Sequence, residues 1–265
     1  MSTVAKAISL LEMLGRGEPE MALADLARRA GFDKATTRRL LLSLMEHELV
    51  EQDEATRRYR LGAGIGRLAL LREAQFPFLR TAVPVIEALA AETDETVHLS
   101  EYSKRGLITV HVIESAKANR VSVPLGELLP MHATASGIAF LAFTEKRIRD
   151  AILDGPFPGF TPFTVSSAAA LSEHIAAARA RGYSIGTQGF EEGVQSVAAP
   201  ILGADGFAIG TIAIAAPQAR IRKGDIERHG ASVAEAARSI GEQLVGRRSL
   251  PDRRRASYDL GLQGD

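Results

Sequence analysis

The chain has 265 residues, 46% of them hydrophobic, which is enough to form two domains that each bury a core. Its 32 Lys and Arg residues balance its 32 Asp and Glu residues, so binding to nucleic acid would require a local basic patch. The absence of cysteine excludes disulfides and thiolate chemistry, and the lack of a signal peptide or membrane span predicts a soluble cytoplasmic protein with no membrane partner.

The first two predicted helices are short and amphipathic. Apolar residues recur at helical spacing over residues 4–14 and again over residues 23–30. The second helix stops at Gly31, a residue that can adopt a positive φ. Phe32 and Asp33 then form a short turn, which is typical of a helix-turn-helix.

A third helix is predicted to begin at Lys34, with Asp33 capping its free N–H groups. Its apolar stripe, which includes Leu40 and Leu44, can pack inward. The opposite side of its N-terminal half is polar and basic, and a helix-turn-helix presents this end to base edges in the major groove. The predicted contact residues are Lys34, Thr36, Thr37, Arg38 and Arg39.

A hairpin with a basic return strand follows the third helix. Strand-like runs over residues 49–52 and 57–61 flank a polar turn, and the second run contains Arg57, Arg58 and Arg60. These arginines suit a wing that lies on the phosphate backbone. Helix-turn-helix geometry also occurs as plain helical packing, and an arginine pair is often only a solvated face. The combination in one segment nevertheless favours a winged module that reads DNA.

The rest of the chain mixes strands with helices. A linking helix is expected before Pro77, where we place the domain boundary. The predicted helices after it cover residues 78–92, 134–143, 145–153, 171–181 and 225–245. The predicted strands cover residues 96–102, 107–114, 121–124, 183–187, 194–202 and 207–216. This order gives an α+β fold class, with helices packed on a mainly antiparallel sheet.

Several of these stretches together resemble the IclR family of bacterial transcriptional regulators. The resemblance covers the helix-turn-helix and most of the chain, from about Val4 to about Val245. It rests on Tyr59-Arg60-Leu61-Gly62, on the runs LPMHATASG (129–137) and EEGVQSVAAP (191–200), and on Gly182-Tyr183 and Asp205-Gly206.

The sequence itself predicts a winged helix-turn-helix domain (1–61), a linker helix (62–76) and a disordered tail (247–265). The resemblance implies that residues 77–246 form a GAF-like effector-binding domain. It also implies a homodimer or homotetramer and effectors that are small organic acids or aromatic compounds. We therefore expect a ligand-responsive repressor of a catabolic operon, with double-stranded operator DNA as its partner. An alternative is a small-molecule-binding metalloprotein or enzyme whose N-terminal domain only packs or oligomerises.

A candidate effector site lies at the last predicted strand. Thr211, Ala213 and Ala215 share one face of this strand, and such small side chains leave space for either a close-packed helix or a ligand. The resemblance favours the ligand. Residues 133–137 open a helix whose free N–H groups and Ser136 hydroxyl could receive an anion. The predicted effector residues are His98, Met131, Ala135, Ser136, Gly186, Ser196, Ala213 and Ala215.

This chain departs from the family pattern around that site. Ser196 stands where the family often has cysteine, and Ile138 stands where it commonly has lysine. Gly186, Ala213 and Ala215 replace residues that make polar contacts in some members. We therefore expect a roomier and less polar pocket, suited to a bulkier, partly apolar effector that could still be a carboxylate.

Three histidines could in principle bind a metal. A hairpin pairing Ser103 with Gly106 would place His98 opposite His111, with His132 nearby, but no acidic or sulfur ligand completes a site. His132 and Ser136 have no orienting third group, so no catalytic residue is predicted. Glu191 and Glu192 should point to opposite faces of a strand and act only as a solvated surface. No cofactor and no metal site is predicted.

Overall fold

The structure is a computed structural model that describes residues 1–222 and 224–249, with only the backbone described at 247–249. The predicted disordered tail lies outside the described residues from position 250 onward, and the last helix runs to Ser249. The chain divides into two compact units, Met1–Pro77 and a second that begins at Phe78. Within the described residues, no helix is both long and apolar enough to cross a membrane.

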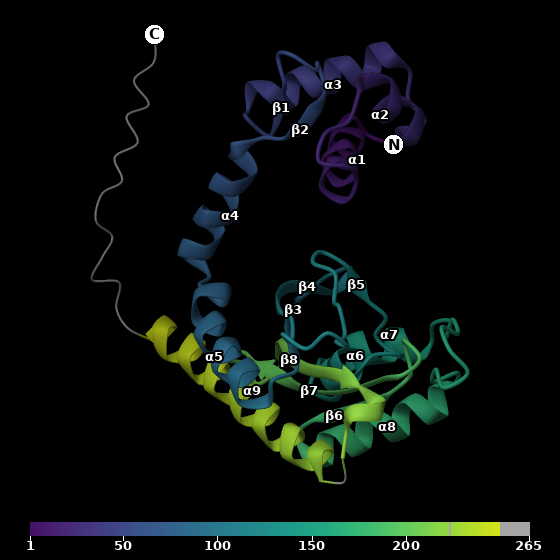
Figure 1. The fold of residues 1–265 in the computed structure, drawn as a ribbon, viewed down its shortest axis with the longest axis vertical. Coiled ribbons are helices and arrows are strands. Elements are labelled where there is room, and N and C mark those ends of the chain that lie inside the picture. Colours follow the sequence, from purple (N-terminus) through teal and green to yellow (C-terminus); the bar gives the residue numbers. More distant parts are fainter. Residues whose placement is uncertain (223, 250–265) are drawn as a thin grey trace. The chain divides into compact units, whose positions relative to one another are not determined.

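The first unit is a helix-turn-helix followed by a hairpin (Figure 1). Its core gathers apolar side chains from the first three helices and the hairpin, including the fully buried Leu10, Leu26 and Leu41. Its elements are α1 (Thr3–Arg16), α2 (Leu23–Ala30), α3 (Lys34–Glu46), β1 (Val50–Gln52), β2 (Tyr59–Leu61) and α4 (Ala63–Gln75).

Local sequence signals set the turn between α2 and α3. Gly31 ends α2 in the left-handed region, with φ of 67°. Asp33 caps α3, because its carboxylate accepts a hydrogen bond from the Thr36 amide at 2.7 Å. The predicted boundaries of both helices are confirmed at these residues.

The second unit contains one six-stranded sheet in which every neighbouring pair is antiparallel, in the order β5-β4-β3-β8-β7-β6. Its strands are β3 (Thr96–Ser103), β4 (Gly106–Ile113), β5 (Leu128–Leu129), β6 (Ser184–Thr187), β7 (Val194–Leu202) and β8 (Ala208–Pro217). Its helices are α5 (Phe78–Thr93), α6 (Ala135–Ala142), α7 (Lys146–Leu153), α8 (Ala168–Arg181), the short η1 (Gln218–Arg220) and α9 (Asp225–Ser249).

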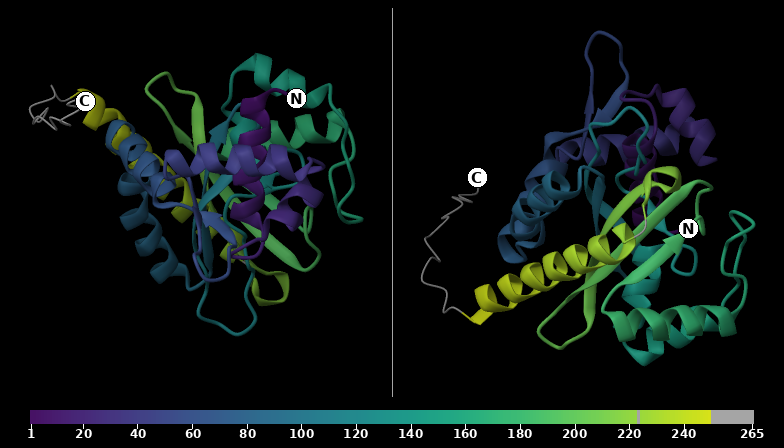
Figure 2. Two further views of the ribbon diagram at one scale, coloured as in Figure 1. Left: turned by 90° about the horizontal axis from the view of Figure 1, so that it is seen from above. Right: turned by 60° about the horizontal axis from the view of Figure 1, so that its bottom comes forward.

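Helices cover both faces of this sheet. Figure 2 shows α9 lying across the strands, and it packs there beside α5. α6 packs against β7 and β8 from the other side, with α8 outside it. The fold is α+β, as the sequence predicts.

Two of the elements predicted for the second unit differ from the structure. Residues 121–124 do not form a strand, because Pro124 has no N–H to donate and the Val121 carbonyl accepts the Thr96 hydroxyl at 2.7 Å. The strand beside β4 is instead the short β5. In addition, α8 begins at Ala168, three residues before the predicted start, because Ser167 caps it through the Ala170 amide.

The register predicted for the β3–β4 hairpin is right at its turn and wrong at its far end. Ser103 does pair with Gly106, but a β-bulge between Leu99 and Ser100 shifts the pairing by one residue. His98 therefore lies opposite Val112, while His111 lies opposite Leu99. Because neighbouring positions on a strand point to opposite faces, the two histidines lie on different faces of the sheet.

Candidate functional site

The exposed end of α3 has the character of a DNA-reading surface. Lys34, Arg38 and Arg39 are exposed, and Thr36 is partly exposed. The Thr36 hydroxyl donates to the Asp33 carboxylate at 2.7 Å, so it belongs to the cap as well as to the surface. Together the exposed side chains form a basic strip on α3 that can approach phosphates or base edges.

Thr37 does not belong to this surface, and its predicted contact role is wrong. Its side chain is fully buried, and its hydroxyl donates to the Asp33 carbonyl at 2.9 Å. The reason is helical spacing, since Thr37 precedes Leu40 and Leu41 by three and four residues and so shares their inward stripe.

The arginines of the hairpin differ in how freely they can contact DNA. Arg60 forms ion pairs with Glu20 at 3.1 Å and Glu51 at 3.2 Å, and Arg58 lies 3.9 Å from Glu18. Arg57 lies at the turn with a positive φ of 57°. Arg60 holds two carboxylates and Arg58 also donates to the Glu20 carbonyl at 3.4 Å, so Arg57 has the fewest side-chain partners of the three among the described residues.

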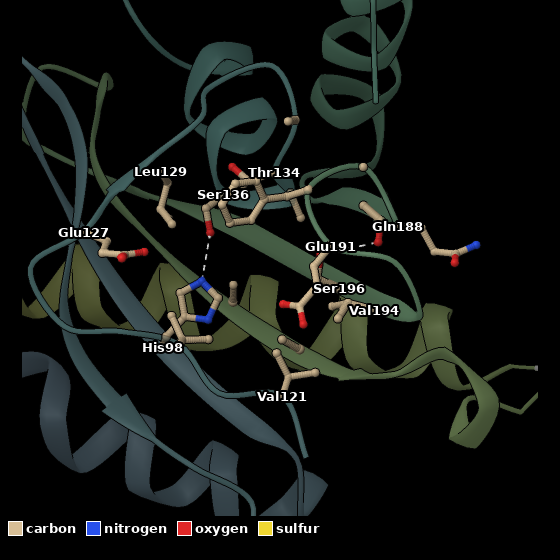
Figure 3. A pocket seen from close by; sticks show the side chains of 18 of the residues that line it. His98, Val121, Glu127, Leu129, Thr134, Ser136, Gln188, Glu191, Val194 and Ser196 are labelled. Carbon is tan, nitrogen blue, oxygen red and sulfur yellow. Dashed lines mark hydrogen bonds between the residues drawn. The ribbon is translucent and has the colours of Figure 1, made fainter. Parts of the chain in front are cut away.

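The second unit contains a cavity of about 290 Å³ between α6 and the sheet. Figure 3 shows His98 and Ser136 side by side in its lining, joined by a dashed line. Seven of the eight predicted effector residues line this cavity: His98, Ala135, Ser136, Gly186, Ser196, Ala213 and Ala215. The strand register explains this gathering, because His98 pairs with Ala213 and Ser196 pairs with Ala215 on one face.

The small side chains of β8 border both a closely packed helix and the cavity. Ala213 packs with Ala135 and Ala139 of α6 and Ala198 of β7, so a helix fills part of the space. Ala213 and Ala215 also border the cavity. Gly186 keeps the chain close here, since a Cβ at this position would lie 2.8 Å from the Ser196 hydroxyl oxygen and 3.1 Å from the Ala135 amide nitrogen.

Met131 does not line the cavity, so its predicted effector contact is wrong. Its side chain is buried in the core cluster that includes Leu107 and Phe140. It precedes α6 by a short turn and packs on the core side of that turn. Sequence position alone does not reveal this direction.

His98 and Ser136 are buried polar residues that line the cavity. Nε2 of His98 lies 3.3 Å from the Ser136 hydroxyl, and Nδ1 of His98 has no hydrogen-bond partner among the described residues. Burial lowers the pKa of His98 to about 4, so the ring is neutral near pH 7. A neutral imidazole with one unused nitrogen can donate to or accept from a bound molecule.

The three histidines do not gather at one place. His132 Nε2 lies 2.9 Å from the Pro158 carbonyl oxygen, and His111 lies on the opposite face of the sheet from His98. Among the described residues, no group of three His, Asp or Glu side chains could hold a metal ion. The histidine beside Ser136 is His98 and not His132. No described residue accepts a hydrogen bond from Nδ1 of His98, so the third member of a catalytic triad is missing among the described residues.

The N-terminus of α6 opens onto the same cavity. The Thr134 hydroxyl caps it by accepting from the Gly137 amide at 3.0 Å. In the described part of the chain, the backbone amides of Ala135 and Ser136 donate to no backbone carbonyl. These two donors, with the positive end of the helix dipole, can bind an oxygen of a ligand.

Sequence reasoning missed the loop residues that complete the cavity. Glu191 and Glu192 lie in the loop between β6 and β7, so the expectation that they occupy a strand is wrong. The flanking Gly189 and Gly193 were the available sign of a loop. The additional polar lining residues are Ser122, Glu127, Thr134, Gln188 and Glu191, and the apolar ones include Val121, Leu129, Phe190 and Val194.

Comparisons with known proteins cover both units. The family described as "Bacterial transcriptional regulator IclR C-terminal" matches residues 74–242, and "IclR helix-turn-helix domain" matches residues 3–54. The glycerol operon regulatory protein of Streptomyces coelicolor is 29% identical over 92% of this chain and 96% of its own. The transcriptional repressor IclR of Escherichia coli is 28% identical over 91% of this chain and 89% of its own.

Solved structures agree with this assignment. A transcriptional regulator of IclR type from a Silicibacter species superposes with a TM-score of 0.79 and 39% identity, covering 92% of this chain and 96% of its own. An IclR homologue from Microbacterium hydrocarbonoxydans, solved with 4-hydroxybenzoate, shares the fold with a TM-score of 0.82 and 23% identity, over 92% of this chain and 99% of its own. The helix-turn-helix unit, the sheet with its cavity and these matches lead to one conclusion: the chain belongs to the IclR family of DNA-binding, ligand-responsive bacterial transcriptional regulators.

Proposed function

We propose that this protein is a cytoplasmic homodimeric repressor of a catabolic operon that responds to a small metabolite. The observation that carries the proposal is the exposed basic strip of α3 in one unit, combined with a cavity in the other. A dimer would present two copies of α3 to successive major grooves of a roughly palindromic operator. A homotetramer would bind DNA through pairs of α3 helices in the same way.

Within this proposal, Arg38 and Arg39 contact bases or phosphates, with Lys34 and Thr36 beside them. Arg57 and Arg58 of the hairpin hold the phosphate backbone. Arg60 contributes less, because its charge is shared with Glu20 and Glu51.

The effector is proposed to be a small organic acid or aromatic metabolite. A cavity of about 290 Å³ suits a molecule with one ring or a short chain. The amides of Ala135 and Ser136 would hold its carboxylate or another oxygen. The 4-hydroxybenzoate complex of the Microbacterium homologue supports this size and class.

Ligand binding would change the affinity for DNA only as far as the ligand binds the two arrangements of the dimer differently. In this scheme the occupied cavity favours a spacing of the α3 helices that does not match the operator. Neither unit has to unfold for this change to occur.

The DNA-binding assignment is tested by an electrophoretic shift assay on the region upstream of the protein's own operon. Arg39→Ala should weaken binding about tenfold or more at physiological salt, because a lost arginine–base contact costs about 1–3 kcal/mol. Arg147→Ala, which removes an exposed arginine of α7, is the matched control and should bind normally. Full affinity of a folded Arg39→Ala protein would refute the assignment of the reading helix.

A further inference from the structure

The charge of the cavity lining is unusual for a site that would receive a purely anionic molecule. Glu127 and Glu191 both line it, and no lysine or arginine does so. Figure 3 shows the two glutamates at the cavity, with Glu127 and Glu191 on opposite sides of His98 in the view. Two glutamate carboxylates without a counter-ion would repel a ligand carboxylate placed beside them.

Basic side chains near this region already have partners. Arg120 donates to Glu114 at 2.8 Å, and Arg220 holds Glu95 with two bonds of 2.7 Å. Lys117 pairs with Asp94 and Glu95. In contrast, Glu127 and Glu191 form no ion pair among the described residues.

His98 provides a second and independent sign of a ligand. The side chain belongs to a residue that is only 7% exposed, it borders the cavity, and its Nδ1 is without a partner among the described residues. A buried nitrogen left in this state costs free energy that a bound polar molecule would recover. Burial also lowers the pKa of His98, so the ring adds no positive charge that would oppose a cation.

We propose that the effector carries a protonated nitrogen, which binds at Glu127 or at Glu191, while its oxygen-bearing end lies at His98 and the N-terminus of α6. This inference rests on the proposed effector site and narrows its chemistry to an amine or an amino acid. A carboxylate at the α6 amides and an ammonium at one of the two glutamates would each have a complementary partner. A dicarboxylate of the same length would place its second charge against the carboxylate of that glutamate.

Two sets of molecules that share a skeleton and differ at one end test the proposal. The aromatic set is 4-(aminomethyl)benzoate, 4-(hydroxymethyl)benzoate and terephthalate. The aliphatic set is 5-aminopentanoate, 5-hydroxypentanoate and glutarate. Binding to the full-length protein is measured by calorimetry and by thermal shift, where a ligand at a hundred times its Kd stabilises by about 2.7 kcal/mol.

The amine of at least one set should bind about tenfold or more tightly than its alcohol and its diacid. Either Glu191→Gln or Glu127→Gln should remove most of this preference. Glu192→Gln is the matched control, because Glu192 is the neighbour of Glu191 and does not line this cavity. It should leave the preference unchanged.

The proposal is overturned if the alcohols or diacids bind as well as the amines, if no amine binds, or if the glutamate variants keep the preference. The readout is separate from DNA binding, which the shift assay follows without any ligand. Loss of the expected amine preference with intact operator binding would therefore refute the amine assignment and leave the DNA-binding function standing. Failure of operator binding with a confirmed amine preference would do the reverse.

Discussion

Thr37 and Arg38 are neighbours in the sequence and meet different surroundings in α3. Thr37 is buried against the core of the first unit, whereas Arg38 is exposed. A polar residue at the start of a recognition helix is therefore not automatically a contact residue. Whether such a residue can contact DNA depends on whether it lies on the buried or the exposed side of the helix.

Thr37→Val tests this distinction. The variant loses the bond to the Asp33 carbonyl, which still receives the Thr37 amide at 3.0 Å, so stability should change by about 1 kcal/mol or less. Operator affinity should stay within about twofold, while Arg38→Ala should lose about tenfold. Both values come from a shift assay at fixed salt, with folding checked by circular dichroism. A tenfold loss in folded Thr37→Val would restore Thr37 as a contact.

His98 should make the stability of the second unit depend on pH. Its folded pKa of about 4 lies below the ordinary value of 6.5, so the unfolded chain binds the proton more readily. The stabilisation is complete above pH 6.5 and is lost as pH falls toward 4, with a slope of up to about 1.4 kcal/mol per pH unit.

Urea unfolding between pH 7 and pH 4.5 measures this slope. His98→Gln should show a shallower decline than the original protein, since the titrating group is gone. His174→Gln, which changes an exposed histidine of α8, should keep the original slope. Equal slopes for the original protein and His98→Gln would contradict the lowered pKa.

At the scale of single elements, the close approach of α6 to the preceding turn fixes one wall of the cavity. A Cβ at Gly137 would lie 2.3 Å from the Met131 carbonyl oxygen and 2.5 Å from its Cα. The contact is with backbone, which cannot rotate away. The turn and the helix therefore depend on glycine at this position.

Gly137→Ala should destabilise the second unit by about 3 kcal/mol, at the upper end of the cost of overpacking. Thermal unfolding followed by calorimetry would show the loss. Gly159→Ala is the control, because nothing lies within 4 Å of a Cβ there, and it should unfold near the original temperature. An unchanged midpoint for Gly137→Ala would mean that the turn can move aside.

The elements that the sequence predicts well are those set by local signals. Gly31 and Asp33 mark the helix-turn-helix through φ and a cap, and both act within a few residues. The bulge after Leu99 is different, because pairing with β8 on one side and β4 on the other decides it. One extra residue at the bulge places His98 and His111 on different faces of the sheet, which the sequence alone does not reveal.

The candidate site was predictable where it lies on strands and helices and unpredictable where it lies on loops. Alternation along β8 identifies Ala213 and Ala215 without knowledge of the fold. Glu127 and Glu191 come from connecting segments whose path depends on tertiary packing. The charge of the cavity therefore becomes visible only in the structure.

At the scale of the whole molecule, the overall charge is balanced, so the proposed operator binding relies on two copies of a small basic strip. We expect light scattering to give a mass of twice the chain mass of 28.4 kDa, or four times for a tetramer. An operator with one half-site scrambled should bind at least about tenfold more weakly than the intact operator. A monomer that binds both DNAs equally would refute the dimer.

The two faces of the strand β3 have different neighbours. His98 borders the cavity, while Val97 and Leu99 are fully buried on the opposite face, and β3 packs with α5. α5 begins at Phe78, whose ring is buried against Gly210 of β8, and the first unit ends one residue earlier at Pro77. Packed interiors have little slack, so a displacement of this strand cannot be absorbed locally. We therefore expect a ligand that displaces β3 at His98 to displace α5 as well, and the first residue of α5 directly follows the first unit in the chain.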